Sequence, residues 1–230
     1  MKIFEISMKV FLMRDIDSTD SLFKIGQFID NGICQDKQLL ELHNKNKFKN
    51  YCFCSFYPLE KDRVYKKNNN YTIKIRTVDK NLAEYFNDKL VNHFNNDIKG
   101  LTSTIKILPK KYIEKIYSIT PAVLKTNEGY WRGNFSVDDF EKRTKENLIK
   151  KYNSLMNTKI DENFDLCTAI KFDNKKPVSI NYKGKKMLGD KVSIQISDNK
   201  MAQNLAYMSL GTGILEMNAR GLGYMNFRWI

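Results

Sequence analysis

The sequence predicts an α+β fold of two tandem ferredoxin-like domains, each with the order β-α-β-β-α-β that RNA recognition modules also have. Segments in which apolar and polar residues alternate, as in strands, are interspersed with segments of helical periodicity. The order β-α-β-β-α-β occurs once in each half of the chain. No long linker separates the halves, which meet near Pro109. We therefore expect domains at residues 1–109 and 110–230, with a central basic cleft between them.

The first half opens at residues 4–12, where apolar side chains alternate with polar ones as in a half-buried strand. Asp17, Ser18 and Thr19 offer N-cap side chains to the helix that follows. The same periodicities predict a helix at 22–29, a short helical piece at 37–43, strands at 51–57 and 71–78, a helix at 81–94 and a strand at 101–108.

The second half repeats this order. Ser136 is the predicted N-cap of a long helix, and Tyr224, Asn226 and Arg228 belong to the closing strand. The other elements that we predict are a strand at 112–119, the long helix at 137–156, strands at 164–172 and 192–196, and a short helix at 199–210.

Charge is the first indication of function. The chain has 230 residues, with 39 Lys and Arg against 26 Asp and Glu, so its formal net charge is +13. Such an excess indicates a polyanionic partner, because neutralising phosphates releases their condensed counterions. A Lys-rich proteome is the alternative explanation of the same composition.

Cysteine and histidine usage argues against a zinc site. The four cysteines include no C-x-x-C pair, and only two histidines are present. The N-terminus carries too many charges for a signal peptide, and no apolar run reaches membrane-spanning length. We therefore expect a cytoplasmic protein that uses no metal and no cofactor and does not enter a membrane.

His43 is the first candidate catalytic residue, because Lys45, Lys47 and Lys49 follow it closely. An imidazole can deprotonate a ribose 2′-hydroxyl or, once protonated, protonate the departing 5′-oxygen. Nearby ammonium groups can stabilise charge on the phosphorane, and attack by a 2′-hydroxyl needs no metal. The alternative is a surface histidine at a helix end. We interpret His93 as an ordinary helix residue.

Two basic segments are candidates for phosphate contacts. A Gly-containing hairpin loop at a sheet edge can enter an RNA groove, whereas a solvated charged face is the alternative for the long helix. The candidate RNA-binding side chains are Lys183, Lys185 and Lys186 in the hairpin and Arg143 and Lys150 on the helix.

The glycine-rich C-terminal segment is the third candidate. Its glycines let a backbone approach phosphates closely and present N–H groups to them. No Gly-Lys-Ser/Thr follows, so it is not a Walker loop, and its spacing is not that of a dinucleotide site. A tight turn is the alternative. Its candidate RNA-binding residues are Gly213, Asn218, Arg220, Gly221 and Gly223.

Together these segments resemble the CRISPR-associated repeat endoribonucleases of the Cas six family, within the RAMP superfamily. The family's loop usually reads Gly-x-Gly, five residues, Gly-x-Gly, with a Lys or Arg among the five. Residues 213–223 match it, except that Leu215 stands at the second glycine, and Arg220 keeps the charge. The stretches 42–56, 116–131, 140–155 and 181–196 are also similar, so the resemblance covers nearly the whole chain in order.

The resemblance implies sequence-specific binding of CRISPR repeat RNA (pre-crRNA) and its cleavage to a 2′,3′-cyclic phosphate and a 5′-hydroxyl. By position, His43 resembles the catalytic histidine, and Lys47 or Lys49 the charge stabiliser. Some members use a tyrosine in the first helix, and residues 22–29 contain none. The sequence leaves open whether the chain is a monomer or a homodimer, and whether it stays on its product in an effector complex.

Two other functions fit the same residues. One is a repeat-RNA-binding protein of this fold with little or no catalysis, and the other is a regulatory RNA-recognition module. The histidine beside the lysines favours the nuclease over both.

Overall fold

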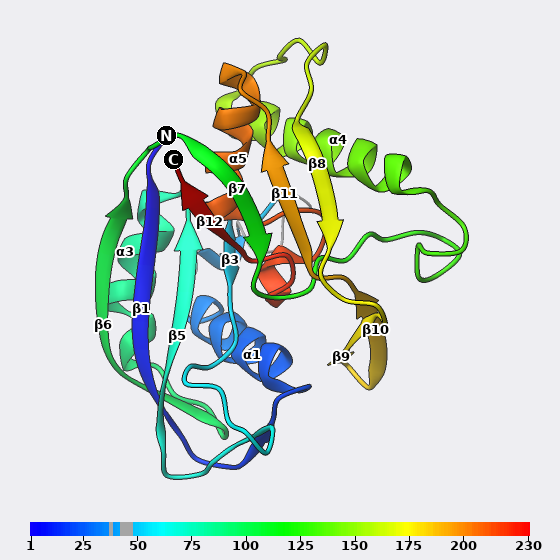
Figure 1. The fold of residues 1–230 in the computed structure, drawn as a ribbon. Helices are drawn as coiled ribbons and strands as arrows, with labels where there is room; N and C mark the ends of the chain where they lie inside the picture. Colours follow the sequence, from blue (N-terminus) through cyan, green and yellow to red (C-terminus); the bar gives the residue numbers. More distant parts are fainter. Residues whose placement is uncertain (37–38, 42–47) are drawn as a thin grey trace.

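The computed structural model describes residues 1–36, 39–41 and 48–230, and each half of the chain contains one four-stranded antiparallel sheet (Figure 1). The strand orders are β3-β5-β1-β6 and β12-β7-β11-β8. In both sheets the first and third strands of the repeating unit lie in the centre, and the second and fourth lie at the edges. The two ferredoxin-like units that the sequence predicts are thereby confirmed.

The first sheet packs its helices on one face, which lies to the rear in Figure 1. Its elements are β1 (Ile3–Leu12), β3 (Tyr51–Phe53), β5 (Asn70–Thr77) and β6 (Ile98–Leu108), with α1 (Ser21–Ile33), α3 (Lys80–Asp88), the 3₁₀ helix η1 (Leu90–Asn92) and the short pair β2 (Ile16–Asp17) and β4 (Val64–Tyr65).

Three predictions for this half need correction. The strand predicted at 51–57 ends at Phe53, and the helix predicted at 81–94 ends at Asp88 before the turn of η1. The N-cap of α1 is Asp20, whose side chain forms no cap hydrogen bond, and the Asp17 side chain instead accepts a hydrogen bond from the Thr19 N–H at 2.8 Å. Of the helical piece predicted at 37–43, residues 37–38 and 42–43 lie outside the described residues, and 39–41 are helical.

The second sheet has the same construction. Its elements are β7 (Ile113–Ser118), α4 (Val137–Met156), β8 (Cys167–Phe172), β11 (Val192–Ile196), α5 (Lys200–Thr212) and β12 (Met225–Trp229), with the hairpin of β9 (Val178–Tyr182) and β10 (Lys185–Gly189) and the 3₁₀ helix η2 (Asn218–Arg220). Ser136 caps α4 as predicted, since its hydroxyl accepts from the Asp139 N–H at 3.1 Å and the Asp139 carboxylate accepts from the Ser136 N–H.

Buried polar contacts join the two sheets. Arg76 of β5 is 3% exposed; it donates to Glu5 of β1 and to the carbonyl oxygen of Met225 in β12, each at 2.6 Å. Its guanidinium also lies 4.6 Å from the ring centre of Tyr224. Tyr207 of α5 donates to the Leu108 carbonyl at 2.7 Å. These polar groups are buried and paired across the boundary, as buried polar groups generally are, so they contribute to the contact between the two units.

Candidate nucleic-acid interface

The glycine-rich loop, residues 213–223 between α5 and β12, crosses over itself. The Ile214 N–H donates to the Gly223 carbonyl at 3.0 Å, and a Cβ on Gly223 would lie 2.3 Å from the Ile214 oxygen. Gly213 and Gly221 have φ of 72° and 82°, and Leu215, at the family's second glycine position, has φ of 53°. The backbone at Leu215 is therefore left-handed, like that of the two glycines, although this conformation is unfavourable for a residue with a side chain.

The N–H groups of the loop glycines are used inside the protein. Gly213 donates to the Ser209 carbonyl, Gly221 to that of Asn218, and Gly223 to that of Pro121, all at 2.8–2.9 Å. In this structure these N–H groups are therefore paired within the protein, at the close crossing of the chain. Direct contact of Gly213, Gly221 or Gly223 with RNA stays a prediction.

Asn218 and Lys151 hold the loop from within. The Asn218 amide nitrogen donates to the carbonyls of Ile214 at 2.8 Å and Leu222 at 2.9 Å. The Lys151 ammonium donates to the carbonyls of Gly213 and Leu215, both at 2.9 Å, and to the Asn218 side-chain oxygen at 2.6 Å. Both Asn218 and Lys151 are buried. The predicted RNA contact of Asn218 thus competes with its role inside the loop.

Lys151 is a residue that the sequence reasoning missed, because its neighbours on the long helix are surface cations. A usable signal was present: Phe140, Thr144, Leu148 and Lys151 follow the spacing of one helical face, and all four are buried. Burial lowers the pKa of Lys151 to about 7, while Cys52 and Glu216 oppose the shift.

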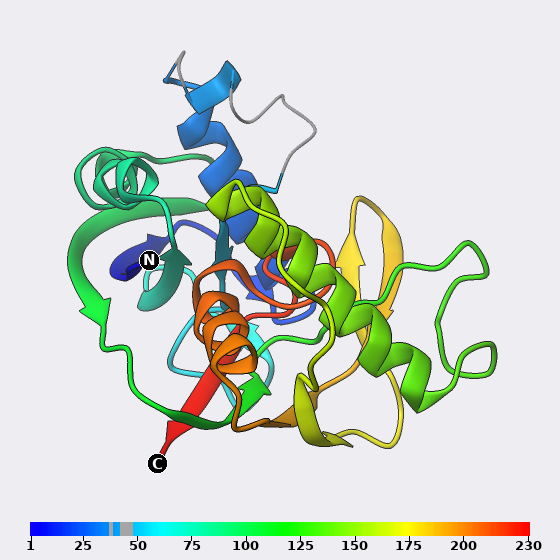
Figure 2. The ribbon, with the colours of Figure 1, turned by 90° about the horizontal axis from the view of Figure 1, so that it is seen from above.

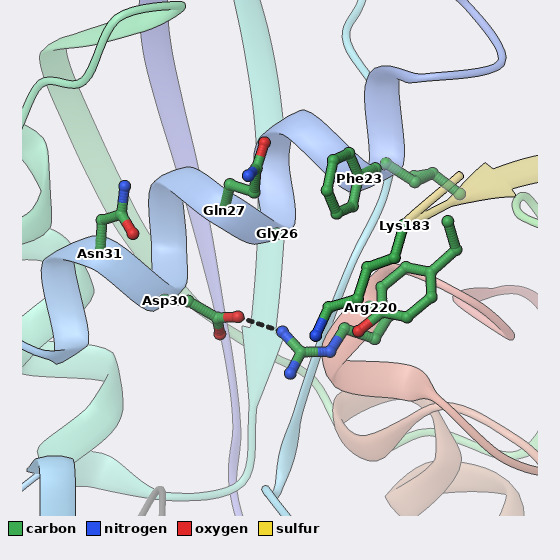
Figure 3. Close-up of a pocket in the computed structure, with 9 residues that line it drawn as sticks. Phe23, Gly26, Gln27, Asp30, Asn31, Lys183 and Arg220 are labelled. Carbon is green, nitrogen blue, oxygen red and sulfur yellow. Dashed lines mark hydrogen bonds and ion pairs between the residues drawn. The ribbon is translucent and has the colours of Figure 1, made fainter. Parts of the chain in front are cut away.

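Arg220 connects the loop to α1 and to the hairpin. Its guanidinium forms an ion pair with Asp30 of α1, shown in Figure 3. The same guanidinium lies 5.9 Å from the ring centre of Tyr182 at the end of β9. Asp30 and Tyr182 therefore fix the position of the one cation that the loop itself carries.

A basic cleft of about 570 Å³ opens beside this loop, bounded also by α4, the end of the hairpin and the residues before β3. Among the described residues that line it are Lys49, Lys125 and Arg220 and the buried Lys151, against one carboxylate, Glu216. Burial lowers the pKa of Lys49, and the positive charge of Arg220 adds to the shift. Such a concentration of cations suits a polyanion.

The structure describes one of the three predicted catalytic residues, Lys49. His43 and Lys47 lie outside the described residues. Lys49 lines the cleft, together with Phe48 and Asn50 on either side of it. The chain that follows the predicted catalytic histidine therefore reaches the same cleft as the glycine-rich loop.

The predicted basic side chains are exposed on two elements, the hairpin and α4. The β9–β10 hairpin is confirmed, with Tyr182 paired to Lys185 across a tight Lys183-Gly184 turn. Lys183, Lys185 and Lys186 are exposed, as are Arg143 and Lys150 on α4. Arg143 and Lys150 lie about one turn to either side of Asn147, which lines the cleft. Figure 2 shows α4, in yellow-green, beside α5, in orange, and Figure 1 shows the hairpin below α4.

His93 lies elsewhere. It follows η1 and is buried, with its ring centre 5.2 Å from that of Phe28, and burial lowers its pKa. In the part of the chain that the structure describes, no group of three His, Cys, Asp or Glu side chains is placed to hold a metal ion. Nor does any described helix have the length and apolar character that a membrane span requires.

Comparison with known proteins identifies the family. A family model described as CRISPR associated protein Cas6, C-terminal, matches residues 108–227, more than half of the chain. The chain belongs to the Cas6 family. The resemblance seen in the sequence is confirmed, and the matched residues include the hairpin, α4 and the glycine-rich loop.

Solved structures agree with a Cas6 fold along nearly the whole chain. A CRISPR associated protein Cas6 is 19% identical, with a TM-score of 0.74 over 98% of this chain and 99% of its own. A RAMP protein described as binding different RNA substrates is 14% identical, with a TM-score of 0.72 over the same shares. A Cas6-related protein from Pyrococcus furiosus is 14% identical, with a TM-score of 0.69 over 98% of each chain. No curated protein sequence matches the chain.

Proposed function

We propose that this Cas6-family chain binds CRISPR repeat RNA and cuts it to mature guide RNAs. The observation that carries the proposal is the basic cleft, where the glycine-rich loop, α4 and the residues that follow His43 meet. Lys49, Lys125 and Arg220 against one carboxylate suit a phosphate backbone, and the exposed hairpin lysines extend the positive surface. The structural likeness to a RAMP protein described as binding RNA is consistent with this ligand.

The proposed reaction uses a nucleophile that the RNA itself supplies. The 2′-hydroxyl gives its proton to a base and attacks the adjacent phosphorus, and the bond from phosphorus to the 5′-oxygen breaks. That oxygen takes up a proton, so the products end in a 2′,3′-cyclic phosphate and a 5′-hydroxyl. His43 is the proposed base or acid, and no metal is required.

Lys49 is the lysine that the structure supports as charge stabiliser. It lines the cleft, and the nearby guanidinium of Arg220 helps to lower its pKa. A cation held close to a second cation is well placed to gain from an added negative charge, such as the one on the phosphorane. Lys47 remains the other candidate for this role.

One observation favours the alternative of a binding protein with little catalysis. Gln27, Asp30 and Asn31 of α1 line a smaller pocket next to the cleft, and α1 contains no tyrosine. Asp30 is already paired with Arg220. Helix α1 therefore supplies no tyrosine that could act as an acid or base together with His43.

The test is to incubate the protein with its repeat RNA and with a shuffled RNA of equal length and composition. We expect cutting at one position of the repeat only, and tight binding without cutting by His43→Ala. If His43→Ala cuts as well as the unchanged protein, the assignment of His43 is wrong. If both proteins bind the repeat and neither cuts it, the binding function replaces the nuclease.

A further inference from the structure

A second, smaller cavity lies next to the basic cleft, between α1, the turn of the hairpin and η2 (Figure 3). It has a volume of about 230 Å³. Leu22 and Gly26 form the α1 side, while Tyr182, Lys183 and Arg220 lie across from them. We call it the α1–hairpin pocket. Its size suits one ring system, and it shares Tyr182 and Arg220 with the cleft.

Gly26 keeps this pocket open. It lies inside α1, where glycine is unfavourable compared with alanine. Outside the helix backbone and its chain neighbours, the single described atom within 4 Å of a Cβ built there is Phe53 Cζ, at an ordinary contact distance of 3.6 Å. Neither backbone strain nor packing against described residues therefore requires glycine here. A side chain at this position would occupy the space in front of Phe23 and Asp30.

The pocket has aromatic and cationic walls. The rings of Phe23 and Tyr182 meet edge to face, with centroids 5.7 Å apart and an interplanar angle of 88°. The Lys183 ammonium and the Arg220 guanidinium each lie 5.9 Å from the Tyr182 ring centre. Exposed aromatic and guanidinium planes are the surfaces on which proteins stack unpaired RNA bases.

Two amide side chains complete the rim. Gln27 and Asn31 are four residues apart on α1, so they project from the same face of the helix. Both are exposed, and neither side chain forms a hydrogen bond within the described part of the protein. An amide offers a donor and an acceptor side by side, which matches the edge of adenine.

We propose that the α1–hairpin pocket holds one unpaired nucleobase of the bound RNA. The base stacks on Phe23 or Tyr182, its edge faces the amides of Gln27 and Asn31, and its phosphate lies toward Lys183. This subsite rests on the proposed function, because it takes RNA as the ligand. It adds a point of base recognition beside the cleft that receives the backbone.

The probes are short single-stranded oligoadenylate and oligouridylate, with affinity measured by fluorescence anisotropy over a range of salt concentrations. Gly26→Met fills the pocket with a good helix former, and Phe23→Leu removes an aromatic wall. We expect each variant to bind oligoadenylate about tenfold more weakly, the effect of losing one stacked base. The slope of log affinity against log salt should stay unchanged, since no phosphate contact is removed.

A matched control separates the pocket from the rest of the surface. Phe135→Leu changes a partly exposed phenylalanine outside the pocket and should bind like the unchanged protein. Gln27→Leu with Asn31→Leu should remove the preference for oligoadenylate over oligouridylate. Melting temperatures at or above that of the unchanged protein show that Gly26→Met folds.

The outcomes are distinct. If the unchanged protein binds its repeat RNA but neither probe, the pocket proposal fails and the proposed function stands. If it binds neither the probes nor the repeat RNA, both fail. If it binds RNA and a folded Gly26→Met binds equally well, the pocket proposal alone is overturned. Equal affinity of the unchanged protein for both probes would overturn the assignment of the amides to adenine recognition.

Discussion

Replacing Lys151 by methionine tests whether the buried amino group of Lys151 holds the glycine-rich loop. Its three acceptors are the carbonyls of Gly213 and Leu215 and the side chain of Asn218. Methionine has a similar unbranched length but cannot donate or titrate. The variant therefore removes both the hydrogen bonds and the proton equilibrium of this residue.

The pH dependence of stability gives the magnitude. Burial lowers the pKa of Lys151 from 10.5 to about 7 in the folded protein. Between these values the unfolded chain binds one more proton than the folded chain, so the free energy of unfolding rises with pH. The stability that the neutral Lys151 contributes is fully present above the pKa of the unfolded state and is lost as the pH falls through the pKa of the folded state. From pH 7.5 to 9.5 the free energy of unfolding therefore rises by about 2.5 kcal/mol.

The assay is urea unfolding at several pH values. The wild-type free energy of unfolding, minus that of Lys151→Met, should rise by about 2.5 kcal/mol across this window. Lys150→Met, at the exposed neighbouring position, is the matched control and should follow the wild type. Parallel curves for the wild type and Lys151→Met would refute the reasoning, because they would show no buried titrating lysine.

Three further predictions concern the loop and the basic surface. Leu215→Gly relieves the strain of a left-handed backbone but removes a side chain that is 1% exposed. We expect the loss of packing to dominate, so that the free energy of unfolding in urea falls by about 2 kcal/mol. An unchanged free energy of unfolding would contradict this expectation. Arg143→Ala should weaken repeat binding without changing the circular dichroism spectrum, and unchanged affinity would remove this part of α4 from the interface. Replacing three exposed hairpin lysines by glutamine should reduce the salt slope of repeat binding by about 0.7 for each of these lysines that neutralises a phosphate. The substituted residues are Lys183, Lys185 and Lys186, and the matched controls are the exposed Lys67, Lys89 and Lys99.

The element order could be predicted from the sequence because it rests on local periodicity. The alternation in residues 4–12 and the cap at Ser136 are both visible without tertiary contacts, and both appear in the structure. Element ends were less predictable. The helix predicted through residue 94 stops at Asp88, although Leu90 and Phe94 continue its apolar spacing. Leu90 is buried in the 3₁₀ turn instead.

The candidate site could be predicted only in part. The glycine spacing located the loop, but the use of its N–H groups depends on Ser209 and Pro121, which only the fold brings near. Lys151 looks like a surface cation until Thr144 and Leu148 show that its face is buried. The pairing of Arg220 with Asp30 joins residues 190 positions apart, and no local pattern reveals it.

The most direct test of the central claim is the chemistry of the RNA ends after cleavage in EDTA. The protein is incubated with its repeat RNA and excess EDTA, and the products are analysed by mass spectrometry. The mechanism proposed for His43 predicts continued cutting, with a 2′,3′-cyclic phosphate on one product and a 5′-hydroxyl on the other. Loss of cutting in EDTA, or products with a 5′-phosphate, would contradict it.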